Sequence, residues 1–121
     1  MKTQEPERRR APRARADFPI DLWADGTVAA RLENISTAGL CCVVGKAIPE
    51  LSLARTTIEL PAGQTPATRK YELEGAVVRC EPREEGDYEV AIFFQFPPPE
   101  AQELITDYVE RQAGRRNTTD S

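Results

Sequence analysis

The side chains best suited to chemistry in this sequence are arginines, and they gather near its start. Residues 1–16 contain Arg8, Arg9, Arg10, Arg13 and Arg15. A guanidinium group keeps its charge at any physiological pH and binds phosphate through two parallel hydrogen bonds. It also pairs with the O6 and N7 edge of guanine and stacks on purines. Arginines four residues apart, such as Arg9 and Arg13, could therefore hold both ends of an anionic nucleotide.

A second group of small polar residues follows in the segment Asn34-Ile35-Ser36-Thr37-Ala38-Gly39, between two expected strands. Asn34 and Ser36 have short side chains that bond to nearby backbone or to a ligand. Gly39 allows a backbone geometry that a side chain would forbid, or the close approach of a ligand. Taken alone, this string is more typical of an ordinary turn, and the arginines are more typical of a solvated basic tail.

Charge is divided unevenly along the chain, whose formal net charge is −4. Residues 1–16 hold six basic and two acidic residues, which sum to +4, so the remaining residues carry −8. This division fits a local anion site better than a nucleic-acid surface, on which positive charge spreads over a whole face.

The composition argues against a metal site and against catalysis. Histidine is absent, and Cys41, Cys42 and Cys80 lack the spacing of a metal motif, so we expect buried thiols and neither a metal nor a disulfide framework. No nucleophile beside a base and no paired carboxylates are evident, which predicts a protein that is not an enzyme and has no cofactor. The charged start and the lack of a long apolar run predict a cytoplasmic protein without membrane insertion.

Alternating apolar residues predict six short strands that must position these groups. The expected strands lie near residues 17–22, 28–33, 38–44, 56–60, 69–80 and 88–96. Asp25-Gly26 suits a two-residue hairpin turn, and Gly75 suits a bulge or a bend within the longest strand. Three prolines, Pro97 to Pro99, end the last strand, and an amphipathic helix follows over about 99–112. Six short strands with turns between them indicate a barrel or a sandwich.

These patterns divide the chain into three parts. Residues 1–16 are charged and lack apolar periodicity, so we expect a flexible basic arm there. Residues 17–112 are expected to form one domain that ends in the helix. Residues 113–121 are polar, and we expect a disordered tail.

In their order and separation, the two polar segments resemble the paired motifs of the PilZ domain family, RxxxR followed one hairpin later by [DN]xSxxG. Arg9 and Arg13 match the first motif, and Asn34, Ser36 and Gly39 match the second. The later segments 75–79 (GAVVR) and 90–94 (VAIFF) are similar to the late strands of that family. The resemblance covers about residues 7–112.

The resemblance implies an all-β fold with a C-terminal helix, a six-stranded antiparallel PilZ-type β-barrel that binds the bacterial second messenger cyclic di-GMP. In such a receptor the arm would close over the ligand with Arg8, Arg9 and Arg13, against a wall formed by Asn34, Ser36 and Gly39. The family usually has Asp where Asn34 stands, and an amide would contact guanine N–H groups differently. Arg79 and Tyr71 are candidates for stacking on a base. A lone domain of this type would signal through a downstream protein partner.

Two other classes of function compete with a nucleotide receptor. Some PilZ-like domains are protein adaptors, for example in pilus or motility machinery, and do not bind the nucleotide, although these usually lack the arginines. A nucleic-acid binder is disfavoured by the acidic remainder of the chain and its few aromatic residues, so we expect no DNA or RNA partner. The resemblance leaves open whether one or two ligand molecules bind.

Overall fold

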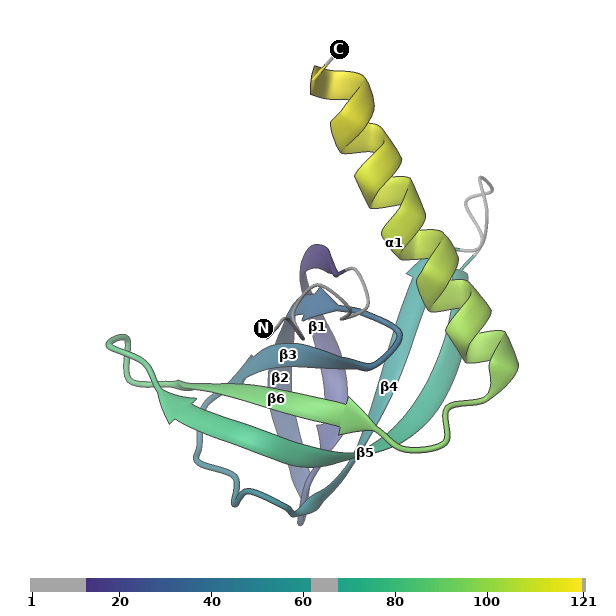
Figure 1. The fold of residues 1–121 in the computed structure, drawn as a ribbon. Coiled ribbons are helices and arrows are strands. Elements are labelled where there is room, and N and C mark those ends of the chain that lie inside the picture. Colours follow the sequence, from purple (N-terminus) through teal and green to yellow (C-terminus); the bar gives the residue numbers. More distant parts are fainter. Residues whose placement is uncertain (1–12, 62–67, 121) are drawn as a thin grey trace, which may run out of the picture.

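Six strands and one helix make up the part of the chain that the structure, a computed structural model, describes: residues 13–61 and 68–120, with side chains through residue 113. Their order is β1 (Ala14–Trp23), β2 (Thr27–Ile35), β3 (Gly39–Val44), β4 (Leu53–Pro61), β5 (Thr68–Pro82), β6 (Tyr88–Phe94) and α1 (Pro99–Asp120). The strands close into one antiparallel barrel in the order β1-β2-β3-β6-β5-β4 (Figure 1). The predicted six-stranded barrel with a C-terminal helix is therefore confirmed.

Alternate side chains of the strands fill the barrel. Along β2, Val28, Ala30 and Leu32 are buried between exposed neighbours, and Ile58 and Leu60 are buried in the same way along β4. This period of two follows from the pleat of a strand, which points successive side chains to opposite faces. Burial of each large aliphatic side chain stabilises the fold by roughly 1.5–3 kcal/mol.

Helix α1 covers one end of the barrel. Its buried residues, Ala101, Leu104, Ile105, Tyr108 and Val109, recur at the spacing of one helical face. This face packs against β1 and β4. Figure 1 shows the last turns of the helix extending past the strands. None of the helices in the described ranges is both long and apolar enough to span a lipid bilayer.

The helix is longer than the sequence predicted. We expected it to end near residue 112 and to give way to a disordered tail over 113–121, and this is wrong because α1 continues to Asp120. Gly114 weakens a helix by about 1 kcal/mol, but no proline follows it, and Ala113 and Arg115 are strong helix formers. Residues 117–120 (NTTD) are weaker helix formers, and nothing in the structure explains why α1 continues through them.

Strand β1 also begins earlier than the sequence predicted. The arm was expected to include residues 14–16, but Ala14 is buried and Arg15 pairs with Asn34 of β2, so these residues belong to the barrel. A bulge shifts the register between Arg15 and Phe18. A bulge interrupts the alternation of inward and outward side chains along a strand. The apolar alternation that starts at Phe18 therefore did not reveal that Ala14 and Arg15 also pair with β2.

The turn between β1 and β2 has the expected residues but a different length. Asp25 and Gly26 both have positive φ, 56° and 120°, as the dipeptide predicted. Trp23 pairs with Thr27, however, so the loop contains three residues rather than two.

Glycine 75 has a different role from the predicted bulge. The register shift of β5 lies between Val77 and Arg79, two residues further on. A Cβ atom at Gly75 would lie 2.5 Å from the carbonyl oxygen of Phe93. The glycine therefore lets β6 approach β5 closely. Strand β6 itself ends at Phe94, two residues before the predicted end, and Phe96 then adopts a positive φ of 52°.

Candidate functional site

Arg13 and Asn34 meet where β1 begins and β2 ends. The Nη1 atom of Arg13 donates a hydrogen bond to the Oδ1 atom of Asn34. Because a guanidinium can only donate, the amide oxygen faces Arg13, and the amide NH2 group is directed away from it. Residues from the two separate sequence motifs are thus in direct contact. The other predicted arginines, Arg8 and Arg9, lie outside the described residues.

A bulge in β2 places Glu33 beside Asn34. Leu32 pairs with Cys42 of β3 and Asn34 pairs with Cys41, so Glu33 is the extra residue on β2. Two consecutive residues of a bulged strand oppose one residue of the neighbour, and the alternation of faces is interrupted there. Glu33 and Asn34 are accordingly both half-buried and line the same cleft.

The hydroxyl of Ser36 is used inside the turn between β2 and β3. Its Oγ atom accepts hydrogen bonds from the backbone N–H groups of Ala38 and Gly39, at 3.1 and 3.3 Å. The backbone N–H of Ser36 donates to the carbonyl oxygen of Gly39 at 2.8 Å. The side chain is only 1% exposed. Ser36 therefore fixes the shape of the turn that carries Asn34.

Gly39 is fitted against the neighbouring strand β6. It pairs with Phe93, and a Cβ atom at Gly39 would lie 2.1 Å from the carbonyl oxygen of Ile92. The backbone N–H of Phe94 also donates to the carbonyl oxygen of Ala38, at 2.9 Å. The backbones of β3 and β6 thus pack so closely that no side chain fits at position 39, and this explains the glycine.

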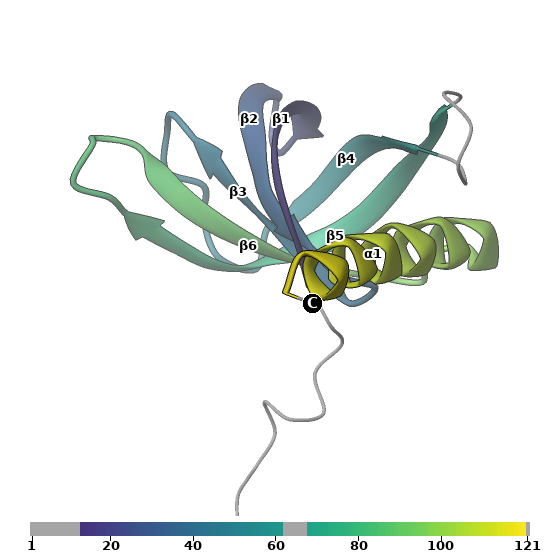
Figure 2. The ribbon, with the colours of Figure 1, turned by 90° about the horizontal axis from the view of Figure 1, so that it is seen from above.

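An open cleft of about 940 Å³ adjoins Asn34. The cleft spans from the turn between β5 and β6 to α1. Figure 2 shows this turn and α1 on either side of β1 and β2. This volume lies within the range of roughly 300–1,000 Å³ that is usual for small-molecule sites. Phe18 and Tyr108 contribute apolar surface, and the charged lining residues are Arg15, Asp17, Arg31, Glu33, Arg83 and Asp87.

The charges of the cleft are mostly paired with one another. Arg31 forms an ion pair with Asp17, and Arg83 lies 3.0 Å from Glu33 and 2.9 Å from Asp87. Three arginines and three carboxylates line the cleft, so its described charges sum to zero. The ion pair with Glu33 ties the hairpin of β5 and β6 to the bulge of β2.

Arg83 is the centre of this network. Burial acts to lower the pKa of Arg83, but the carboxylates of Asp87, Glu85 and Glu33 together raise it above its ordinary value. A backbone hydrogen bond and Arg83 lower the pKa of Glu85. Both groups therefore stay charged at neutral pH, and the hairpin keeps its electrostatic tie to β2.

The sequence motifs do not include Arg31, Glu33 or Arg83. Glu33 could have been noticed, because Glu33 and Asn34 place two polar residues in succession at the end of an alternating strand. Arg83 lies in a polar segment that indicated only a turn, and its partner Glu33 is 50 residues away in the sequence. A pair so distant in sequence comes together only through the pairing of β2 with β3 and of β3 with β6.

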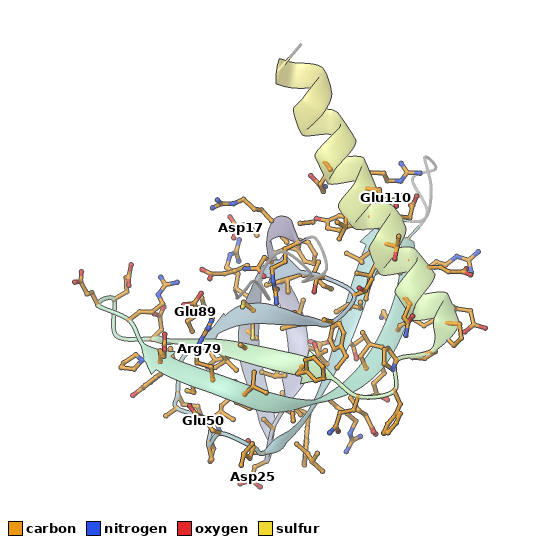
Figure 3. The ribbon with its side chains drawn as sticks, viewed as in Figure 1. Asp17, Asp25, Glu50, Arg79, Glu89 and Glu110 are labelled. Atoms are coloured by element: carbon orange, nitrogen blue, oxygen red, sulfur yellow. The ribbon has the colours of Figure 1, made fainter. Side chains whose placement is uncertain are left out.

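Arg79 and Tyr71, the two candidates for base stacking, occupy different parts of β5. Arg79 pairs with Ala91 of β6, and its Nη2 atom lies 3.9 Å from Sγ of Cys41, the residue that pairs with Asn34. Figure 3 labels Arg79 beside Glu89 on this side of the barrel. Tyr71 packs partly against the core. Of the two, Arg79 lies nearer to the predicted motif residues.

The thiols have ordinary interior surroundings. Cys41 and Cys42 are buried, and Cys80 is half-buried. Burial raises the pKa of the Cys42 thiol to about 12, with smaller contributions from Cys41 and Glu33. The part of the chain that the structure describes contains no cluster of three metal-binding side chains.

Comparisons with known proteins identify the family. The PilZ domain model matches residues 7–111. The structure of the inhibitor of motility (MotI/DgrA) from Bacillus subtilis is similar in fold, with a TM-score of 0.76 and 21% sequence identity. That match covers 89% of this chain and 53% of the other, so this chain spans about half the length of that protein. No curated protein sequence matched the chain. With nearly its whole length matched by the family model, this chain belongs to the PilZ domain family.

Proposed function

We propose that this chain is a cyclic di-GMP receptor that binds its ligand in the cleft beside Asn34 and holds it with the N-terminal arginines. The observation that carries the proposal is the hydrogen bond between Arg13 and Asn34, since it joins the last arginine of RxxxR to the first residue of NxSxxG. Membership of the PilZ family and the volume of the cleft support it. The chain acts by binding rather than by catalysis.

The charges of the cleft suggest which protein groups bind the phosphates of the ligand. Because the described lining is neutral overall, Arg13 and the arginines before it supply the attraction for the two phosphates. Arg8 and Arg9 take the same role as Arg13 in this proposal. Guanidinium–phosphate contacts are charge-assisted, and each contributes roughly 1.5–3 kcal/mol.

The polar groups at the bulge of β2 suit the edges of guanine. Guanine presents acceptors at O6 and N7 and donors on its exocyclic amine. The NH2 group of Asn34 can donate to the former, and the carboxylate of Glu33 can accept from the latter. Ser36 and Gly39 act through the turn, which they hold against β6. In this proposal the amide of Asn34 and the neighbouring carboxylate of Glu33 together contact one guanine base.

A second candidate function is that of a protein adaptor that does not bind the nucleotide. The solved structure with the same fold is named an inhibitor of motility, which favours an output through a protein target. The receptor proposal also requires a downstream protein partner. The two functions therefore differ in whether cyclic di-GMP controls that output.

Titration calorimetry separates these possibilities. The wild-type chain is titrated with cyclic di-GMP, GTP and a single-stranded oligonucleotide, and we expect heat from cyclic di-GMP alone. Arg9→Ala and Arg13→Ala should abolish this binding while circular dichroism shows an intact barrel. Arg69→Ala is the matched control, because Arg69 is an exposed arginine of β5 that does not line the cleft. Binding of the oligonucleotide without cyclic di-GMP would overturn the proposal, and no response to any ligand would favour the adaptor.

A further inference from the structure

An apolar patch lies on the outer face of β4, β5 and β6. The register places Leu53 of β4 beside Ala76 of β5, and Ala76 beside Phe93 of β6. Val78 is the next outward residue of β5, and the N–H of Leu51 donates to the carbonyl oxygen of Val77. We call these five residues the outer patch: Leu51, Leu53, Ala76, Val78 and Phe93.

The outer patch is exposed to an extent that the fold does not require. Leu51 is 81% exposed, Leu53 67%, Val78 50% and Phe93 56%. Single exposed apolar residues are common on protein surfaces, but neighbouring ones on adjacent strands mark interaction sites. The patch consists of such neighbours, so it is a candidate contact surface.

The backbone at Leu51 supports the same conclusion. Leu51 has a φ of 71°, in the left-handed region that glycine and asparagine tolerate better than leucine. Its side chain is largely exposed, so packing within the barrel does not offset this strain. Leu51 is thus unfavourable for the local backbone and does not pack in the core. This combination points to a role in contact with another molecule.

Charges at the two ends of the patch indicate what covers it. On β5, Glu74 and Arg79 flank Ala76 and Val78. Among the described residues Glu74 has no ion-pair partner, since the opposite Arg55 lies over the ring of Trp23 at 5.1 Å. Among the described residues, the one ion-pair contact of Arg79 is a distant one of 3.9 Å with Glu81, and its Nη2 atom also lies 3.9 Å from Sγ of Cys41. Figure 3 labels Arg79 on the barrel wall and Glu50, which precedes Leu51, below it.

This distribution is self-complementary. When a second copy is turned by 180° about an axis through the patch near Ala76, its Arg79 faces Glu74 of the first copy, and its Glu74 faces Arg79. The apolar residues of both copies then lie between the two ion pairs. Such an arrangement is what a twofold interface requires, because the same surface must serve both partners.

We propose that the outer patch is a twofold interface between two copies of this chain. Leu53, Val78 and Phe93 pack across the axis, and the pairs of Glu74 with Arg79 fix the relative orientation. The interface adjoins the NxSxxG turn, because Phe93 pairs with Gly39 in the ladder of β3 and β6. It does not depend on the proposed ligand, so it is tested without cyclic di-GMP.

The first experiment measures the mass of the full chain by sedimentation equilibrium over a concentration series. We expect a dimer for the wild type. Phe93→Glu should raise the dissociation constant of the dimer by at least about tenfold. Thr27→Glu places the same side chain on an exposed position of β2 that is not one of the five patch residues, and should leave the dimer unchanged. A wild-type chain that stays monomeric at every concentration overturns the proposal. This holds even when a different protein binds the patch.

The second experiment tests the orientation by exchanging charges. Glu74→Arg alone and Arg79→Glu alone should each prevent self-association, because like charges then face each other. An equimolar mixture of the two variants should form a heterodimer, in which both contacts again join opposite charges. The double variant should form a homodimer. If both single variants are folded and their mixture stays monomeric, the proposed interface is wrong.

Discussion

The guanidinium of Arg13 is hydrogen-bonded to the amide oxygen of Asn34, 21 residues further along the chain. The contact joins the residue just before β1 to the penultimate residue of β2, where both strands carry bulges. It brings the last motif arginine to the edge of the cleft. The position of Arg13 relative to the turn is therefore set in part by a side chain that is itself a candidate ligand contact.

Substitution of Asn34 tests this double role. Asn34→Ala should weaken cyclic di-GMP binding by about tenfold or more, since it removes a ligand hydrogen bond and releases Arg13. Stability should fall by less than about 1 kcal/mol, because the pair with Arg13 is exposed. Calorimetry and thermal unfolding measure the two effects. Asn34→Asp, which keeps a partner for Arg13 but has no NH2 donor, should keep the stability and still weaken binding. Wild-type affinity in Asn34→Ala would remove Asn34 from the site.

Gly39 and Gly45 form a matched pair for a test of backbone packing. A Cβ atom at Gly39 would meet the carbonyl oxygen of Ile92 at 2.1 Å, whereas one at Gly45 would have no atom within 4 Å. Gly39→Ala should therefore destabilise the barrel by about 3 kcal/mol or more. Gly45→Ala should be neutral or slightly stabilising, because alanine restricts the unfolded chain. Urea denaturation gives both values, and equal losses would contradict this explanation of Gly39.

Ser36→Ala tests whether the motif serine holds the turn. The substitution leaves the N–H groups of Ala38 and Gly39 without the Oγ acceptor, and we expect a loss of about 1–3 kcal/mol in the free energy of unfolding. Thr37→Ala, at the neighbouring half-buried position, should cost less than half as much. If Ser36→Ala impairs ligand binding at unchanged stability, the hydroxyl contacts the ligand directly.

The buried thiol of Cys42 predicts a loss of stability at high pH. Burial raises its pKa from 9.0 to about 12. An acid with a raised pKa in the folded state binds its proton more tightly there, so its contribution is complete below pH 9 and is lost as the pH rises from about 9 to about 12. The free energy of unfolding of the wild type should therefore fall more steeply over this range than that of Cys42→Ala. Parallel curves would show that the thiol does not contribute.

Local patterns in the sequence predicted most of the fold. Alternation located all six strands, and the spacing of Leu104, Ile105 and Tyr108 located the helix, because both signals depend only on near neighbours. The errors occurred where a local rule was interrupted. The bulge after Arg15 hid the start of β1, and the polar residues after 112 indicated a helix end that the structure places later, at Asp120.

The candidate site was less accessible to sequence reasoning. The motifs indicated Arg13, Asn34, Ser36 and Gly39, and the structure brings Arg13 to Asn34. It could not be foreseen that Gly39 packs on β6 rather than adopting a special backbone angle, because that depends on which strand lies next to it. The tie between Arg83 and Glu33 likewise depends on the pairing of β3 with both β2 and β6, which brings together residues that no short window contains.

Closure of the barrel also limits how this protein can be recognised. Because β1 pairs with β4 as well as with β2, each of the six strands has a neighbour on both sides. A target cannot add a strand of its own where both edges of a strand are paired, so the only part of the β1–β4 junction open to such capture of an extended peptide lies beyond the three pairs of Asp21–Trp23 with Arg55–Thr57. The same feature protects against uncontrolled edge-to-edge polymerisation despite the exposed leucines and phenylalanines. Over the closed part of the barrel, selectivity for a target therefore resides in side chains, so point substitutions there can change it without altering the backbone.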